Sequence, residues 1–208
     1  MADAAVVDPD EVASHARIEH DTNTGISNTK LGMWLFLASE CLLFGGLITT
    51  YLLYKTPLTA EQGPAPKQVY DIPFTSVSSF VLLMSSLTMV LAVSAIERGD
   101  HHRLRVWLAA TALLGATFIS GQIYEFTVFK GEGMGYTTSR SSSAFYTLTG
   151  FHGVHVTVGI IMLVSLLLLS LRGRIPEHRS ETVETVGLYW HFVDVVWIVI
   201  FAVVYLIP

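Results

Sequence analysis

Five long apolar stretches divide the 208-residue chain. They cover residues 31–54, 73–96, 104–129, 144–171 and 184–207. A helix needs about 20 apolar residues to cross the hydrocarbon core of a bilayer, and each stretch is at least that long. A strand of a membrane barrel would instead show about 10 residues of alternating character. The pattern therefore predicts an all-α fold, an integral membrane bundle of five transmembrane helices.

The composition agrees with a membrane protein. Of the residues, 51% are hydrophobic and 14% are charged, with a mean hydropathy of +0.53. A soluble domain usually carries about 25% charged residues. The net charge of -5 comes mostly from acidic residues near the N-terminus, so no basic surface for a nucleic acid is present. The single cysteine, Cys41, excludes an internal disulfide and a paired-cysteine metal site.

The chain divides into a short tail and one membrane domain. Residues 1–29 are predicted to be a polar, mobile, cytoplasmic tail, and residues 30–208 the five-helix domain. Lys and Arg are more frequent on the side that holds this tail and the second and fourth connections than on the other side. The positive-inside rule therefore predicts a cytoplasmic N-terminus and a C-terminus outside.

Glu40 is a carboxyl group deep inside the first apolar stretch. Helical spacing places it on one face with Phe44 and Tyr51. A charge at membrane depth is expensive and is usually kept for a reason. Glu40 could take part in proton transfer, or it could be a neutral acid hydrogen-bonded across a helix contact. The residues alone leave both possibilities open.

Four further polar groups lie in the third and fourth stretches. Gln122 and Glu125 share a helical face, and the position of Glu125 near the outer end favours a structural carboxyl group. His152 and His155 could ligate a haem, with His191 as a ligand from a second helix. Such a haem needs its two histidines on opposite sides of the ring, and membrane histidines also serve as hydrogen-bond donors between helices. Hydrogen bonding is therefore favoured.

His191 and Asp194 lie one helical turn apart in the last stretch. At this i, i+3 spacing they could pair directly. A histidine beside a carboxylate resembles half of a catalytic pair or the outer shell of a metal site, yet no serine or cysteine nucleophile motif accompanies it. We therefore expect a buried pair that fixes helix register, in one network with His152, His155 or Glu40.

Four segments, in this order, resemble subunit III of the haem-copper terminal oxidases. They are LGMWLFLASECLLFGGLITTYLLY, FISGQIYEFTVF, SAFYTLTGFHGVHVTVG and ETVGLYWHFVDVVWIVIFAVVY. The resemblance covers nearly everything from residue 30 onward, and its FHGxHV and YWHFVDVVW parts are quite specific. It implies a subunit with no catalytic residue, metal ligand or redox centre of its own, packed directly against subunit I. Haems and copper would lie in the partner subunits.

The resemblance also implies a role for this chain. Subunit III supports proton uptake by subunit I, protects it during turnover and binds phospholipid, and Glu40 corresponds to the family's membrane-buried glutamate. Arg172, Arg174 and Trp190 are candidate lipid contacts, although the two arginines could equally serve only to set topology. The five-helix length resembles the short bacterial form, which implies the bacterial plasma membrane. Subunit II and membrane lipids are further expected partners.

The electron donor stays open at this point. We expect an aa3-type cytochrome c oxidase, which couples oxygen reduction to proton translocation. Quinol oxidases and an accessory protein of nitric oxide reductases share the same pattern. Two alternatives come from other classes: a stand-alone membrane b-type haem protein and a transporter. The absence of an internal sequence repeat argues against the transporter.

Overall fold

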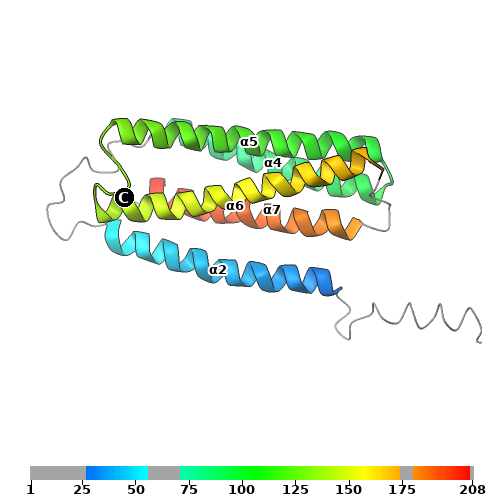
Figure 1. Cartoon of the computed structure of the whole chain (residues 1–208), viewed down its shortest axis with the longest axis horizontal. Coiled ribbons are helices and arrows are strands. Elements are labelled where there is room, and N and C mark those ends of the chain that lie inside the picture. The colour runs from blue at the N-terminus through cyan, green and yellow to red at the C-terminus, as the bar shows by residue number, and fades with distance from the viewer. Residues whose placement is uncertain (1–26, 56–70, 174–179, 207–208) are drawn as a thin grey trace, which may run out of the picture.

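Helices make up almost all of the described chain. The computed structural model describes residues 27–55, 71–173 and 180–206, with no strand among them (Figure 1). The long helices are α2 (Asn28–Lys55), α4 (Ile72–Glu97), α5 (His101–Gly131), α6 (Arg140–Leu171) and α7 (Ser180–Phe201), and a π-helical segment, η2 (Ala202–Leu206), continues α7. Each is long and apolar enough to cross a membrane, when α7 is taken with η2. The predicted all-α membrane bundle is therefore confirmed.

The helices run alternately up and down and lie side by side. In Figure 1, α4 and α5 form the upper layer, α6 and α7 the middle, and α2 lies below them against α6 and α7. The first residues of α2, α5 and α7 consequently lie at one end of the bundle, together with the last residues of α4 and α6. We call this the N-terminal end. Most of the predicted polar tail lies outside the described residues.

Three helices begin at side-chain caps. Asp71, Asp100 and Ser139 each accept a hydrogen bond from the backbone N–H three residues further on, at 3.0–3.2 Å. These bonds satisfy donors that a helix start leaves free. Helices α4 and α6 are followed within two residues by Gly99 and Gly173, whose φ angles are 70° and 65°. Glycine adopts this left-handed conformation at little cost, so the chain can turn there.

Trp190 is the largest fully buried side chain among the described residues. Its side chain is fully buried, and its ring lies between Gly115 of α5 and Gly159 of α6. A Cβ atom added to Gly115 would be 2.6 Å from the ring, and one added to Gly159 would be 2.7 Å from it. Small residues of this kind let membrane helices approach closely. Both glycines therefore make room for one aromatic ring.

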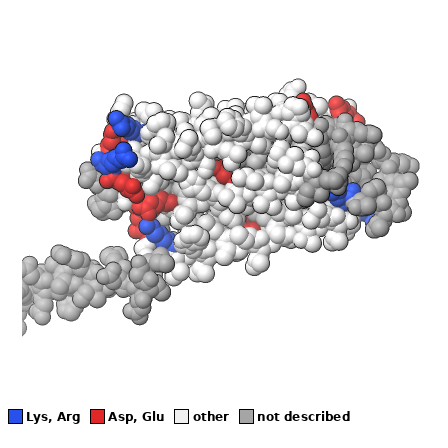
Figure 2. Space-filling view, turned by 180° about the vertical axis from the view of Figure 1, so that it is seen from behind, with Lys and Arg blue, Asp and Glu red and all other residues white. Residues whose placement is uncertain are grey.

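Charged side chains gather at the two ends of the bundle. Figure 2 shows a broad, almost uncharged surface between them, as expected of a protein surrounded by lipid. At the N-terminal end, Lys30 pairs with Glu184 at 2.5 Å, and Arg103 pairs with Asp100 at 3.1 Å. The assignment of this end to the cytoplasm stays a prediction.

Candidate functional site

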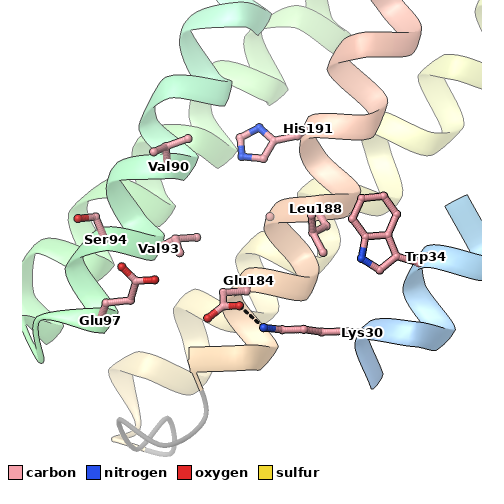
Figure 3. A pocket seen from close by; sticks show the side chains of 10 residues that line it. Lys30, Trp34, Val90, Val93, Ser94, Glu97, Glu184, Leu188 and His191 are labelled. Atoms are coloured by element: carbon pink, nitrogen blue, oxygen red, sulfur yellow. Dashed lines mark ion pairs between the residues drawn. The ribbon is translucent and has the colours of Figure 1, made fainter. Parts of the chain in front are cut away.

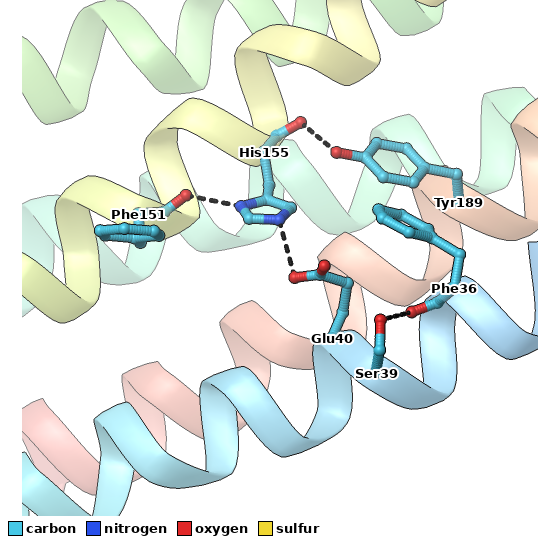
Figure 4. A network of polar contacts seen from close by, with 6 residues as sticks. All are labelled: Phe36, Ser39, Glu40, Phe151, His155 and Tyr189. Atoms are coloured by element: carbon cyan, nitrogen blue, oxygen red, sulfur yellow. Dashed lines mark hydrogen bonds and ion pairs between the residues drawn. The ribbon is translucent and has the colours of Figure 1, made fainter.

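Glu40 and His155 form an ion pair between α2 and α6 (Figure 4). Oε2 of Glu40 lies 3.1 Å from Nε2 of His155, and the two side chains are only 13% and 15% exposed. The other ring nitrogen, Nδ1, lies 2.8 Å from the carbonyl oxygen of Phe151. A carbonyl can only accept, so Nδ1 carries a hydrogen. Nε2 is the ring nitrogen that faces the Glu40 carboxyl.

Neighbouring side chains hold this pair in place. The hydroxyl of Tyr189 donates to the carbonyl oxygen of His155 at 3.0 Å. The ring of Phe44 packs edge-on against the imidazole at 5.1 Å. Phe44 and Tyr51 are both buried, so the helical face predicted to contain Glu40 does point into the bundle. Glu40 thus joins α2 to α6 through His155.

A row of serines on α4 receives the polar groups of α7. The pairs are Trp197 with Ser79 at 2.8 Å, Trp190 with Ser85 at 3.0 Å, and His191 with Ser86 at 2.6 Å. The indole nitrogens donate to the serine oxygens. These serines were not predicted as site residues. The spacing of Ser79 from Ser85 and Ser86, six and seven residues, is close to the seven-residue spacing of the two tryptophans on the antiparallel helix.

His191 and Asp194 do not pair directly, which corrects the sequence expectation. His191 binds Ser86 of α4 through Nδ1. The Asp194 carboxyl is 3% exposed, and neither oxygen makes a hydrogen bond of ordinary geometry to any residue of the described chain. The Ser86 hydroxyl of α4 lies near this carboxyl. Both α7 side chains therefore face the same serine of α4.

The predicted single network of these residues is also wrong. Nε2 of His152 lies 3.2 Å from the carbonyl oxygen of Val193, and its ring packs against Trp197 at 4.8 Å. His155 instead points toward α2, where it meets Glu40. Three residues along a helix leave the two side chains about 60° apart around its axis, so His152 meets α7 and His155 meets α2. The buried histidine contacts are therefore separate.

Glu125 and Gln122 join α5 to its neighbours. Oε1 of Glu125 accepts hydrogen bonds from Thr75 of α4 at 2.5 Å and from Tyr205 of η2 at 3.3 Å. The Gln122 amide donates to the carbonyl oxygen of Thr149 on α6 at 2.8 Å. All of these contacts are buried. Glu125 thus links three segments near one end of the bundle.

The three candidate lipid residues have different surroundings. Trp190 is 0% exposed and cannot contact lipid, so that expectation is wrong. Its indole is enclosed because the two glycines that flank it let α5 and α6 come close. Arg172 is exposed just after the end of α6, and its lipid contact stays a prediction. Arg174 lies outside the described residues.

The donor set of the described helices does not resemble a metal centre. No three His, Cys, Asp or Glu side chains come together there in a way that could hold a metal ion. His152, His155 and His191 each contact a different helix through at least one ring nitrogen. A haem between any two of them would have to displace these contacts.

The fold and these contacts define a multi-pass α-helical membrane protein whose buried polar groups join its helices. A comparison with family sequence models finds cytochrome c oxidase subunit III, which matches residues 10–207. The chain therefore belongs to the cytochrome c oxidase subunit III family. It is subunit III of a haem-copper oxidase, of either the cytochrome c or the quinol type.

Relatives of both types are similar over most of the chain. Cytochrome c oxidase subunit 3 of a Bacillus species is 40% identical over 179 residues, which covers 86% of both chains. Cytochrome c oxidase subunit 3 of a Synechocystis species is 42% identical over 180 residues, 85% of this chain and 74% of the relative. Quinol oxidase subunit 3 of Bacillus subtilis is 39% identical over 194 residues, 93% of both chains.

Proposed function

We propose that this chain is the accessory subunit III of an aa3-type cytochrome c oxidase, with no redox centre of its own. Its role is to stabilise subunit I, to support proton uptake by that subunit and to bind lipid. The observation that carries this proposal is the set of histidine contacts, because His152, His155 and His191 all contact other helices. Histidines that contact other helices stabilise the bundle, and their ring nitrogens can bind or release protons. The haems and copper belong to partner subunits.

The proposed setting is the bacterial plasma membrane, with the N-terminus in the cytoplasm. Subunit I is the direct partner, and subunit II belongs to the same complex. Support comes from α2, which packs mainly against α6 and α7. It leaves large side chains on its outer face exposed, with Leu42 at 81% and Leu35 at 65%. A helix with this much apolar surface suits contact with lipid or with another membrane subunit.

Cytochrome c as the electron donor is the finer part of the proposal. Two cytochrome c oxidase relatives, at 40% and 42% identity, are slightly more similar to this chain than a quinol oxidase relative at 39%, and a third cytochrome c oxidase relative is 37% identical. The donor is determined by subunit II, which in a cytochrome c oxidase carries the ligands of a dinuclear copper site. A quinol oxidase is the second candidate, supported by the greater length over which its subunit 3 aligns.

Affinity purification in a gentle detergent from the native membrane tests the whole proposal. Mass spectrometry should identify a haem-copper subunit I together with a subunit II that has copper ligands. The purified complex should consume oxygen with reduced cytochrome c and not with a quinol. Oxygen consumption with quinol alone would reassign the donor. A chain that purifies without any oxidase subunit would overturn the accessory role, and haem absorbance on the isolated chain would show a redox centre of its own.

A further inference from the structure

A groove of about 660 Å³ enters the bundle between α2, α4 and α7 (Figure 3). Its mouth lies at the N-terminal end, where Glu97, Glu184 and Lys30 line it. Its inner part is lined by apolar side chains and ends at His191. From Glu184 to His191 the helix rises about 10 Å, at roughly 1.5 Å per residue. The groove therefore connects the charged end of the bundle with a histidine at membrane depth.

His191 is the link between this groove and a buried acid. One side of the residue lines the groove, and its Nδ1 lies 2.6 Å from the Ser86 hydroxyl. The same hydroxyl also lies near the carboxyl of Asp194. Asp194 is about 4.5 Å further along α7 than His191 and is 3% exposed, and neither of its oxygens has a hydrogen-bond partner among the described residues. The three groups follow one another from the groove inward as imidazole, hydroxyl and carboxyl. Groups of these kinds can each gain and lose a proton or pass one on.

We propose that His191, Ser86 and Asp194 form a proton-exchange site in which the Asp194 carboxyl gains and loses a proton through this groove. The site goes beyond the proposed accessory role, and it does not depend on which electron donor the oxidase uses.

The transfer balances without any other reactant. A proton from the groove binds Nε2 of His191, and the ring passes its Nδ1 proton to the Ser86 oxygen. The Ser86 hydroxyl proton moves to the Asp194 carboxylate, which becomes a neutral acid. The ring is left with its hydrogen on Nε2, and the reverse sequence returns the proton to the groove. One proton is gained or lost in each direction, and no bond other than O–H and N–H changes.

The surroundings favour exchange over a fixed ion pair. The charged and titratable groups that line the approach are Lys30 of α2, Glu97 of α4 and Glu184 of α7. On the α6 side, the ring of His152 binds the carbonyl oxygen of the residue before Asp194. No ion pair holds Asp194 within the described part of the chain. A lone carboxylate buried without a charged partner is costly, so a route by which a proton reaches it matters.

Infrared difference spectroscopy of the purified complex tests the site. Protonation of Asp194 produces the C=O band of a carboxylic acid, and labelling aspartate with ¹³C shifts that band and identifies it. After a pH jump, the band should change in the parent protein and be absent in Asp194→Asn. In Ser86→Ala and His191→Phe the band should remain, but its rate of change should fall at least tenfold. Ser76→Ala is the matched control, because this exposed α4 hydroxyl bonds only its own helix.

Each other outcome contradicts the proposal. An aspartate band that does not respond to pH would show that the carboxyl is isolated. Equal rates in Ser86→Ala, His191→Phe and the control would show that the proton takes another route. A response that appears only after delipidation would show that the groove holds an acyl chain instead of a proton path. These readings come from one carboxyl group, so they stay separate from the purification result that tests the accessory role.

Discussion

Adding one methyl group beside Trp190 should destabilise the bundle. In Gly159→Ala the new Cβ would lie 2.7 Å from Cε3 and Cζ3 of the indole. Contacts under 3.0 Å essentially never occur for real Cβ atoms, so the ring or α6 must move. The ring cannot retreat toward α5, where a Cβ at Gly115 would already be only 2.6 Å away. Its N–H is also fixed, at 3.0 Å from Ser85.

The size of the effect follows from a matched control. Gly150 lies on the same helix, and a Cβ added there meets nothing within 4 Å. Both substitutions gain the same helix propensity, about 0.5–1 kcal/mol. Overpacking of a well-filled core costs about 1–3 kcal/mol. Gly159→Ala should therefore be less stable than Gly150→Ala by about 1–3 kcal/mol.

Reversible unfolding of the purified protein in mixed detergent measures this difference. Trp190→Phe provides a second check, because a smaller ring leaves space for the methyl group. Gly159→Ala should cost less in the Trp190→Phe background than in the parent, with a coupling energy of at least about 0.5 kcal/mol. Equal stability of Gly159→Ala and Gly150→Ala would refute the claim that the glycines make room for the indole.

Three other predictions test separate contacts. Ser79→Ala leaves a buried indole N–H without its acceptor and should cost about 1–3 kcal/mol, whereas Ser76→Ala, on the exposed face of the same helix, should change the unfolding free energy little. Glu40→Ala should cost a similar amount because Nε2 of His155 loses its partner, while Glu40→Gln should cost less; equal losses in thermal unfolding would argue against the ion pair. The hydrogen bond from the backbone N–H three residues on lowers the pKa of Asp100, so the first turn of α5 should lose stability as the pH falls below about 4, and hydrogen exchange should detect this. Asp100→Asn, which still caps the helix, should abolish the pH dependence, and an unchanged dependence would contradict the assignment.

The helices were predictable, but the contacts between them were not. Length and hydropathy predict all five spans, because a helix in lipid must satisfy its backbone within itself. The same pattern correctly turns Phe44 and Tyr51 inward with Glu40. Spacing along one helix says nothing about the neighbour across the contact. The i, i+3 spacing therefore suggested that Asp194 pairs with His191 within α7. The structure instead places Ser86 of α4 opposite both His191 and Asp194.

Two misplaced residues show the same limit. Trp190 was expected to contact lipid, yet Gly115 and Gly159 enclose it. Only the packing of three helices shows that these glycines face the same ring. His155 lies on the same helix as His152 but meets α2, which depends on where α2 docks. Such facts become visible only when the helices are placed in space.

The separation of Glu40 and His155 along the chain affects how the protein is made. The two residues are 115 positions apart, and the helix that carries Glu40 is synthesised first. At roughly 5–20 residues per second, translation takes about 6–23 s to reach His155. During that interval α2 is in the translocation machinery or the bilayer with a glutamate whose partner does not yet exist. Helix α2 can dock onto α6 and α7 only after those helices have been made, so this docking belongs to the last steps of biogenesis.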